Sequence, residues 1–442
     1  MTKEMPAGGA GAAPGSRLAF AVRALKVRNY RLFFAGQMVS LIGTWMQTVA
    51  QSWLVYRLTG SALLLGSVGF CTQFPVFLVA AVGGAVADRH NRHRIVVATQ
   101  TASMLQAAVL AALTLTGRIQ VWHVFCLAAS LGLINAFDIP ARQSLIADLV
   151  ERKDLINAIA LNSSMFNSAR IIGPAVAGVL VGTLGEGWCF FANAVSFLAV
   201  IAGLLMMDFT PRPVPARTSG ALEHMLEGFR FVRRASPVRA LLLLLGMTSL
   251  LGMPYVVLMP IFADRILHGG ARALGLLMSS AGLGALLGAM SLALRRSGAR
   301  GLMRVVAASS VAFGVSLILF SVSRYFWLSA ALLVPVGFAL MVQMASSNTL
   351  IQSMVPDHLR GRVMAVYSMM FMGMAPFGSL YAGAFAHWAG APSTVALGGV
   401  VCIAGASMFA ARLTTLHPEA RRLIDVQDPG GASLPAPAPP SV

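Results

Sequence analysis

The dominant pattern along the chain is a succession of long apolar stretches separated by short polar segments. Stretches of roughly 18 to 25 apolar residues have the length of a helix that crosses a lipid bilayer. Links as short as residues 185–187 leave little alternative to helical hairpins. The first six predicted spans cover residues 32–54, 62–87, 95–116, 121–139, 160–184 and 187–207. The second six cover residues 240–262, 273–294, 303–322, 325–346, 363–388 and 391–411.

The pattern predicts an all-α polytopic membrane protein with 12 transmembrane helices in two six-helix halves. Between the halves, apolar positions in residues 221–234 recur at helical spacing, which predicts an amphipathic helix on the inner surface. The last residues are rich in proline and alanine and are expected to be disordered. The predicted domains are a basic cytosolic N-arm (1–31), an N-terminal half (32–207), a cytosolic linker (208–239), a C-terminal half (240–411) and a disordered cytosolic tail (412–442).

An internal repeat supports the division into halves. Residues 144–178 align without a gap on residues 349–383, and this alignment maps the fifth span onto the eleventh. Gly173 matches Gly378 and Gly178 matches Gly383. Two six-helix halves in the same orientation characterise one large transporter class, in which the binding site lies between the halves.

Composition and charge agree with a membrane location. The chain is 57% hydrophobic and only 11% charged, whereas soluble domains carry about 25% charged residues. The net charge of +18 comes from arginines and lysines that fall between spans on one side. This asymmetry places both termini in the cytosol and makes a nucleic-acid partner unnecessary. Of the arginines and lysines, the predicted outer loops hold only Arg57, Arg118, Arg265, Arg272 and Arg324.

Catalytic and cofactor motifs are missing from the sequence. The only lysines are Lys3, Lys26 and Lys153, and none follows a glycine as a phosphate-binding loop requires. There is no H-E-x-x-H or C-x-x-C pattern, so we expect no enzyme, no metal site and no cofactor. A non-transporting membrane sensor or scaffold remains an alternative, because it would need only the fold.

The corner between the second and third spans reads GGAVADRHNRHR. It resembles the signature loop of the major facilitator superfamily, with Gly84, Asp88, Arg89 and Arg92 at the matching positions. The resemblance implies a cytosolic gate, in which the glycine lets helices 2 and 11 approach and the aspartate sits at the N-terminal end of helix 11. A carboxylate there would meet the positive end of a helix dipole. Asn91 replaces a glycine of the motif, and we expect it to adopt the same left-handed turn.

A narrower resemblance covers most of the chain. The strings WLVYRLTGSA, FDIPARQSLIADLV, NAIALNSSMFNSARIIGPAVAG and NTLIQSMVPDHLRGRVMAV are similar to the enterobactin-exporter branch of the superfamily. The resemblance implies ion-driven efflux, with a proton as the expected coupling ion, of siderophore-like or other amphipathic small molecules. Broad lipophilic drug efflux is the alternative. Gly173, Pro174 and Gly178 also resemble part of the helix-5 motif of drug/proton antiporters. We expect a monomer embedded in the lipid bilayer, and the resemblance implies a bacterial inner membrane.

Polar side chains inside the predicted spans indicate a substrate cavity. The first span carries glutamines, serines and threonines at steps of three and four, which form one stripe on a helix. Such a stripe faces other helices or water. The predicted cavity residues are Gln37, Thr44, Gln47, Gln51, Asn167, Arg170, Gln343 and Asn348.

Arg170 is the unusual member of this set, because it falls near the middle of the fifth span. Insertion of an isolated arginine costs about 2.5–3.5 kcal/mol at that depth, so it needs water or a partner. It is either a structural arginine bonded to carbonyls or glutamines, or a cation that meets anionic or phenolic oxygens of the cargo or responds to proton movement. Asp138, at the inner end of the fourth span, is the nearest candidate acid, and Asp138 and Arg170 are the predicted coupling residues.

Overall fold

The computed structural model describes residues 23–208, 221–295 and 301–427, and this part of the chain is helical almost throughout. Most of the N-arm, residues 209–220 of the linker and the end of the tail lie outside the described residues. The N-terminal elements are η1 (Arg23–Lys26), α2 (Arg28–Thr59), α3 (Ala62–Arg89), α4 (Arg92–Leu115), α5 (Val121–Leu149), η2 (Arg152–Asp154), α6 (Leu155–Leu184) and α7 (Glu186–Leu205).

The C-terminal elements begin with the amphipathic helix α8, whose bounds match the prediction. They are α8 (Ala221–Arg234), α9 (Ser236–Met247), η3 (Thr248–Gly252), η4 (Met253–Leu258), α10 (Met259–Ile261), η5 (Phe262–Ile266), α11 (Gly270–Ala293), α12 (Leu302–Val322), α13 (Phe326–Met354), α14 (Asp357–Phe371), α15 (Ala375–Ala389), α16 (Ala391–Ala411) and α17 (Leu413–Gln427).

Eleven helices in the described part of the chain are long and apolar enough to cross a membrane. The helix α2 is 32 residues long but is not among them, because its polar stripe lowers its hydropathy. The protein is therefore an all-helical, multi-pass membrane protein. Large apolar side chains such as Leu78, Leu105 and Leu198 are more than half exposed, as expected for faces that lipid covers.

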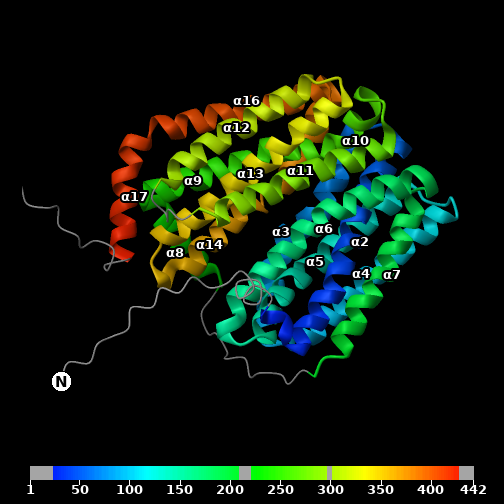
Figure 1. Ribbon diagram of the computed structural model, residues 1–442, viewed down its shortest axis with the longest axis horizontal. Coiled ribbons are helices and arrows are strands. Elements are labelled where there is room, and N and C mark those ends of the chain that lie inside the picture. The colour runs from blue at the N-terminus through cyan, green and yellow to red at the C-terminus, as the bar shows by residue number, and fades with distance from the viewer. Residues whose placement is uncertain (1–22, 209–220, 296–300, 428–442) are drawn as a thin grey trace, which may run out of the picture.

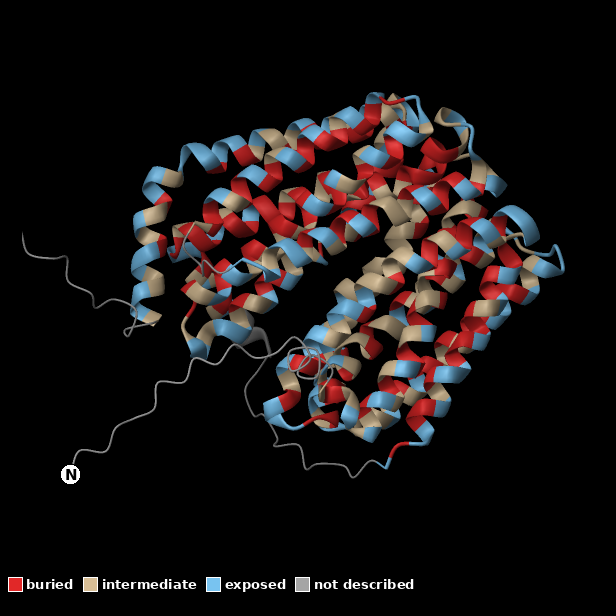
Figure 2. Ribbon diagram, in the orientation of Figure 1, coloured by how far each residue is buried: buried red, intermediate tan, exposed pale blue. Residues whose placement is uncertain are grey.

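The helices form two groups that lie side by side (Figure 1). Helices α2–α7 make up one group and α9–α16 the other, and the groups lie closest at the end where α10 is found, here called the α10 end. They are further apart at the opposite end, near α8 and α14, here called the α8 end. Buried residues lie mainly where helices of one group face each other (Figure 2).

Glycines bring the two groups together towards the α10 end. A Cβ atom added to Gly383 on α15 would lie 2.7 Å from the carbonyl oxygen of Ala62 and 2.8 Å from the Cα of Gly66 on α3. A Cβ added to Gly178 on α6 would lie 3.0 Å from the Cα of Gly275 on α11. Such close backbone approach is typical of packing between membrane helices, where small residues replace the hydrophobic effect as the source of tight contact.

Two predicted spans are not continuous helices. Residues 240–262 were expected to form one helix, but the chain passes from α9 through a π turn, a 3₁₀ turn and a second π turn to Ile266. Pro254 and Pro260 each remove a backbone donor inside this segment, which interrupts the α-helical ladder. The expected helix 363–388 is likewise divided into α14 and α15, with Pro376 at the start of α15.

The expectation of a disordered tail over residues 412–442 is wrong for its first part. Residues 413–427 form α17, while residues 428–442 lie outside the described residues. Leu416 and Ala420 are buried against α9 and α13. The Glu419 carboxylate accepts a hydrogen bond of 3.1 Å from the backbone N–H of Ser236, which lies at the start of α9. The apolar stripe of α17 thus supplies the contacts that hold it on the C-terminal group.

Candidate functional site

A cavity of about 310 Å³ lies between the two groups of helices. Its walls come mainly from α2 and α3, and the C-terminal group closes it with Val256, Val257 and Met278. None of the lining residues carries a charge. The remaining lining residues are Thr44, Gln47, Thr48, Gln51, Ser52, Val55, Leu65, Val68, Gly69, Thr72, Gln73, Gln106, Leu131, Asn193 and Phe197.

The polar stripe of α2 forms one side of this cavity. Thr44 and Thr48 donate their hydroxyl hydrogens to the carbonyls of Ser40 and Thr44, each at 2.9 Å. These two hydroxyls therefore present lone pairs to the cavity. Gln51 is buried and makes no hydrogen bond to the described residues, so its amide can both donate and accept. The stripe predicted from the sequence thus brings Thr44, Gln47 and Gln51 together at one wall.

Gln47 also belongs to a buried amide cluster inside the N-terminal group. Its Nε2 donates to Gln106 Oε1 at 3.0 Å, and its Oε1 accepts from Asn193 Nδ2 at 2.7 Å. Gln106 in turn donates to the carbonyl of Leu127 at 3.2 Å. Sequence reasoning missed Gln106 and Asn193, because a helical period identifies a face but not the partners across it. The cluster fixes the orientation of Gln47 at the cavity wall.

Arg170 lies on α6 beside α2, and its guanidinium carbon stands 5.9 Å from the centre of the Trp45 ring. It makes no hydrogen bond or ion pair to any residue that the structure describes. The neighbouring Asn167 donates to the carbonyl of Ser163 on its own helix at 2.9 Å. Neither Asn167 nor Arg170 is among the residues that line the 310 Å³ cavity.

The three residues of the helix-5 motif lie at helix contacts. A Cβ on Gly173 would lie 2.9 Å from the carbonyl oxygen of Ile42 and would overlap Trp45, so this glycine lets α6 approach α2. Gly178 faces Gly275 on α11. Pro174 lies inside α6, which continues past it to Leu184. The motif therefore sits where α6 meets both α2 and α11.

Asp138 is buried on α5, and its carboxylate bonds to side chains of the N-terminal group. It accepts hydrogen bonds from Thr99 Oγ1 at 2.8 Å and Gln100 Nε2 at 2.9 Å, and it pairs with Arg142 Nε at 3.2 Å. The structure brings Asp138 to Arg142, one helical turn away, and records no contact between Asp138 and Arg170.

The signature corner between α3 and α4 lies at the α8 end, away from the C-terminal group. Nothing lies within 4 Å of a Cβ built on Gly84, and Asp88 is exposed, with Arg92 3.9 Å away. Arg92 pairs more closely with Asp148 on α5, at 2.8 Å. Sequence reasoning missed Asp148, although an acid at the end of α5 next to this basic corner was a usable signal. Arg89 is exposed.

Asn91 does not adopt the left-handed turn that we expected. Its φ is −65°, and its side chain accepts a hydrogen bond of 3.2 Å from the N–H of Arg94 as the N-cap of α4. Asparagine is among the preferred N-cap residues, which explains why it fits this position for a different reason.

Gln37, Gln343 and Asn348 do not line the cavity in this structure. Gln37 is buried and its Oε1 has no hydrogen-bond partner among the described residues. Gln343 is buried and donates to Thr248 Oγ1 at 2.9 Å. Asn348 accepts a hydrogen bond of 2.6 Å from Gln352 on its own helix.

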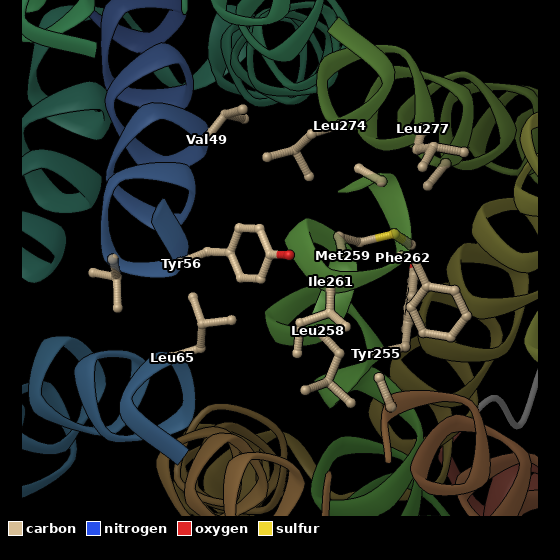
Figure 3. Packing of buried hydrophobic residues seen from close by; sticks show 14 of the residues in the cluster. Val49, Tyr56, Leu65, Tyr255, Leu258, Met259, Ile261, Phe262, Leu274 and Leu277 are labelled. Atoms are coloured by element: carbon tan, nitrogen blue, oxygen red, sulfur yellow. The ribbon is translucent and has the colours of Figure 1, made fainter. Parts of the chain in front are cut away.

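Polar contacts that the sequence did not predict join the two groups at the α10 end. Tyr56 points from α2 towards the segment that contains Met259 and Ile261 (Figure 3), and its hydroxyl donates to Asp264 Oδ2 at 2.8 Å. Arg265 donates to the carbonyl of Gly60 at 3.1 Å, and its guanidinium carbon stands 5.8 Å from the Tyr56 ring. We refer to Tyr56, Gly60, Asp264 and Arg265 as the α10-end latch.

A family model described as transmembrane secretion effector, of the major facilitator type, matches residues 19–427. The staphyloferrin A transporter of Staphylococcus aureus is 26% identical over 394 residues, which cover 88% of this chain and 98% of that protein. The multidrug efflux pump Tap of Mycolicibacterium fortuitum is 28% identical over 80% of this chain and 88% of its own. The enterobactin exporter EntS of Shigella boydii is 25% identical over 77% of this chain and 80% of its own.

The fold is similar to that of solved transporters. The crystal structure of the nucleoside transporter NupG aligns with a TM-score of 0.68 and 15% sequence identity, over 88% of this chain and 98% of that one. At this identity the likeness concerns the fold alone.

Proposed function

The chain belongs to the transmembrane secretion effector family of the major facilitator superfamily, and from that premise we propose that it is a secondary active transporter that exports siderophore-like or other amphipathic small molecules. The resemblance noted in the sequence is confirmed by the family match and by the relatives. The proposal rests on one observation above all, the cavity between two groups of helices, whose wall combines apolar side chains with uncharged amides and hydroxyls. A small-molecule site at such an interface is what alternating access requires.

We propose that α2 is a twelfth membrane span and that the protein consists of two six-helix halves. Support comes from the length of α2, from its packing against α6 and α7, and from the repeat that relates residues 144–178 to 349–383. The bacterial relatives favour an inner membrane, and the charge asymmetry favours cytoplasmic termini, so that the α8 end faces the cytosol. We also propose that the N-arm and the linker lie in the cytosol and that the protein is a monomer.

We propose further that this conformation is open towards the cytosol. The latch and the glycine contacts hold the groups together at the α10 end, whereas Gly84 at the α8 end has free space around it. Closure of the α8 end would then bring Asp88 to the N-terminal end of α14, where the helix dipole favours a carboxylate. In this scheme Gly84, Asp88, Arg89 and Arg92 form the cytosolic gate, in its released state.

For binding and coupling we propose separate roles for two charged residues. Arg170 meets anionic or phenolic oxygens of the cargo, since it lacks the hydrogen bonds that a structural arginine would make. Asp138 is the proposed carboxylate for proton coupling, supported by its burial and its pairing with Arg142. Gln37, Asn167, Gln343 and Asn348 remain proposed cavity residues of other conformations in the cycle.

The test is metabolite profiling of a deletion strain under iron limitation, together with a drug-sensitivity panel. We expect an oxygen-rich chelator to accumulate in the cells and to leave them again when the wild-type gene is restored. Restoring the Arg170→Ala variant should not restore export, although the variant inserts into the membrane. Arg118→Ala is the matched control, because it removes an exposed arginine far from the cavity. A deletion strain with unchanged metabolites and unchanged drug sensitivity would refute the proposal.

Broad drug efflux is the second candidate, favoured by the similarity to Tap. In that case the deletion strain would become sensitive to several unrelated lipophilic drugs without accumulating a chelator. The two outcomes are distinguished in the same experiment.

A further inference from the structure

The surroundings of Arg170 form a small, well-packed unit on α2 and α6. The Trp45 indole contacts two α6 side chains one turn apart: the Arg170 guanidinium carbon is 5.9 Å from its ring centre, and Phe166 is in edge-to-face contact at 5.7 Å and 72°. Gly173 provides the room for Trp45 to lie this close to α6, because any side chain there would overlap it. The indole is therefore held in place from more than one direction.

Arg170 differs from the other partly buried arginines of the N-terminal group. Arg92 pairs with Asp148 at 2.8 Å and Arg142 with Asp138 at 3.2 Å, and the exposed Arg57 pairs with Glu186 at 2.7 Å. A carboxylate neutralises each of these cations and occupies their N–H donors. Arg170 faces an aromatic ring in place of a carboxylate.

An aromatic face stabilises a cation in a way that a carboxylate does not. The negative face of the indole attracts the positive charge, yet it leaves the charge uncompensated. A guanidinium has five N–H donors, and no described protein oxygen accepts from those of Arg170. The pair thus keeps a full positive charge with open donors at a depth where such a charge is costly.

The C-terminal group contributes a second unsatisfied polar atom. The Tyr255 hydroxyl is buried and has no hydrogen-bond partner among the described residues. The open N–H donors of Arg170 therefore favour a hydrogen-bond acceptor with negative charge. The uncharged cavity lining does not supply one.

We propose that Trp45 is a positioning residue that holds Arg170 charged and unpaired, and that the two together select cargo bearing a negatively charged oxygen, such as a carboxylate or catecholate. This inference rests on the proposed transport function and names the chemical class that its site takes. Guanidinium–carboxylate pairs are short, strong and directional, so such a group would be preferred over a neutral ester of the same shape.

Two matched probes test the selection directly, a fluorescent methoxycoumarin carboxylate and its ethyl ester. Equilibrium binding to the purified full-length protein in detergent is measured by fluorescence anisotropy. We expect the wild type to bind the acid at least about 10-fold more tightly than the ester, since a charged hydrogen bond contributes about 1.5–3 kcal/mol. Arg170→Gln should abolish this preference.

Trp45 is tested by the ratio of the two affinities. Trp45→Leu should weaken binding of the acid about 3- to 30-fold, as expected for loss of a cation–π contact, and leave binding of the ester within about 2-fold. Trp45→Phe restores an aromatic face and should recover part of the preference for the acid. Trp388→Leu is the control, because it removes an exposed indole at the end of α15.

The outcomes separate this inference from the function on which it rests. A merely structural Trp45 would lower thermal stability and weaken both probes equally, and that result would overturn the inference. Wild-type protein that does not prefer the acid, or binds neither probe, would also overturn it. If the deletion strain still accumulates its cargo in that case, the inference fails while the transport function stands.

Discussion

The latch at the α10 end should determine how often the protein opens on that side. Replacing Tyr56 by Phe removes the hydroxyl that donates to Asp264 at 2.8 Å, while the ring remains beneath the Arg265 guanidinium. The Arg265 bond to the Gly60 carbonyl is also retained. The substitution therefore isolates one hydrogen bond between the two groups of helices.

The size of the effect follows from the chemistry of this bond. A hydrogen bond to a charged group contributes about 1.5–3 kcal/mol, and the lower end applies here because Asp264 is only half-buried and water competes for it. At 1.4 kcal/mol per factor of ten, we expect the population open at the α10 end to rise about 10-fold. Asp264→Asn keeps a neutral acceptor and should have a smaller effect, about 2- to 10-fold.

Cysteine accessibility measures this population. A single cysteine at Thr48, a cavity-lining position, is introduced after the four native cysteines are replaced by serine. A membrane-impermeant maleimide added to the outer face then labels it at a rate proportional to the population open on that side. Tyr325→Phe is the control, because Tyr325 is exposed and its hydroxyl makes no hydrogen bond to the described residues. Equal labelling rates in Tyr56→Phe, Tyr325→Phe and the parent protein would refute the reasoning.

Three further predictions concern the gate, the glycine contacts and the linker helix. Asp88→Asn should slow transport in proteoliposomes but leave thermal stability unchanged, because Asp88 is exposed in this conformation; a loss of stability would argue against a gating role. Gly383→Val places a side chain against Gly66 and should disfavour this conformation by about 1–3 kcal/mol, which raises labelling from the outer face. Glu227→Gln removes the ion pair with Arg362 between α8 and α14, and a change in unfolding free energy above about 1 kcal/mol would contradict the small contribution expected of a pair that water still reaches.

Bilayer thickness explains why the helices could be predicted from sequence. A span must contain about 20 apolar residues, so hydropathy locates most spans. Six of the twelve predicted stretches lie wholly inside observed helices, and four more pass a helix end by one or two residues. The breaks after α9 and between α14 and α15 did not follow from hydropathy, because π and 3₁₀ turns keep the chain as apolar as an α-helix does. The prolines at 254, 260 and 376 were the available signal.

The candidate site was predicted only in part, for a related reason. The period of α2 identified the face that carries Thr44, Gln47 and Gln51, but the partners Gln106 and Asn193 lie on other helices. Contacts between groups, such as that of Tyr56 with Asp264, depend on the relative positions of both groups and have no local signal. The α17 helix could have been predicted from the spacing of Leu416, Ala420 and Leu423, which a proline- and alanine-rich ending obscured.

The two copies of the internal repeat differ in the charged and polar side chains that they carry. Arg170 corresponds to Ala375 in the alignment of residues 144–178 with 349–383, and Ala375 begins α15 just after the helix break. The same position thus carries a charge in a continuous helix of one group and a helix start in the other. The lining residues follow this division, since the polar ones come from the N-terminal group, while Val256, Val257 and Met278 come from the C-terminal group. A charge that were part of the common scaffold would be needed in both copies, so its presence in one copy, unpaired and beside Trp45, supports the proposed cargo-binding role of Arg170 over a role in helix packing.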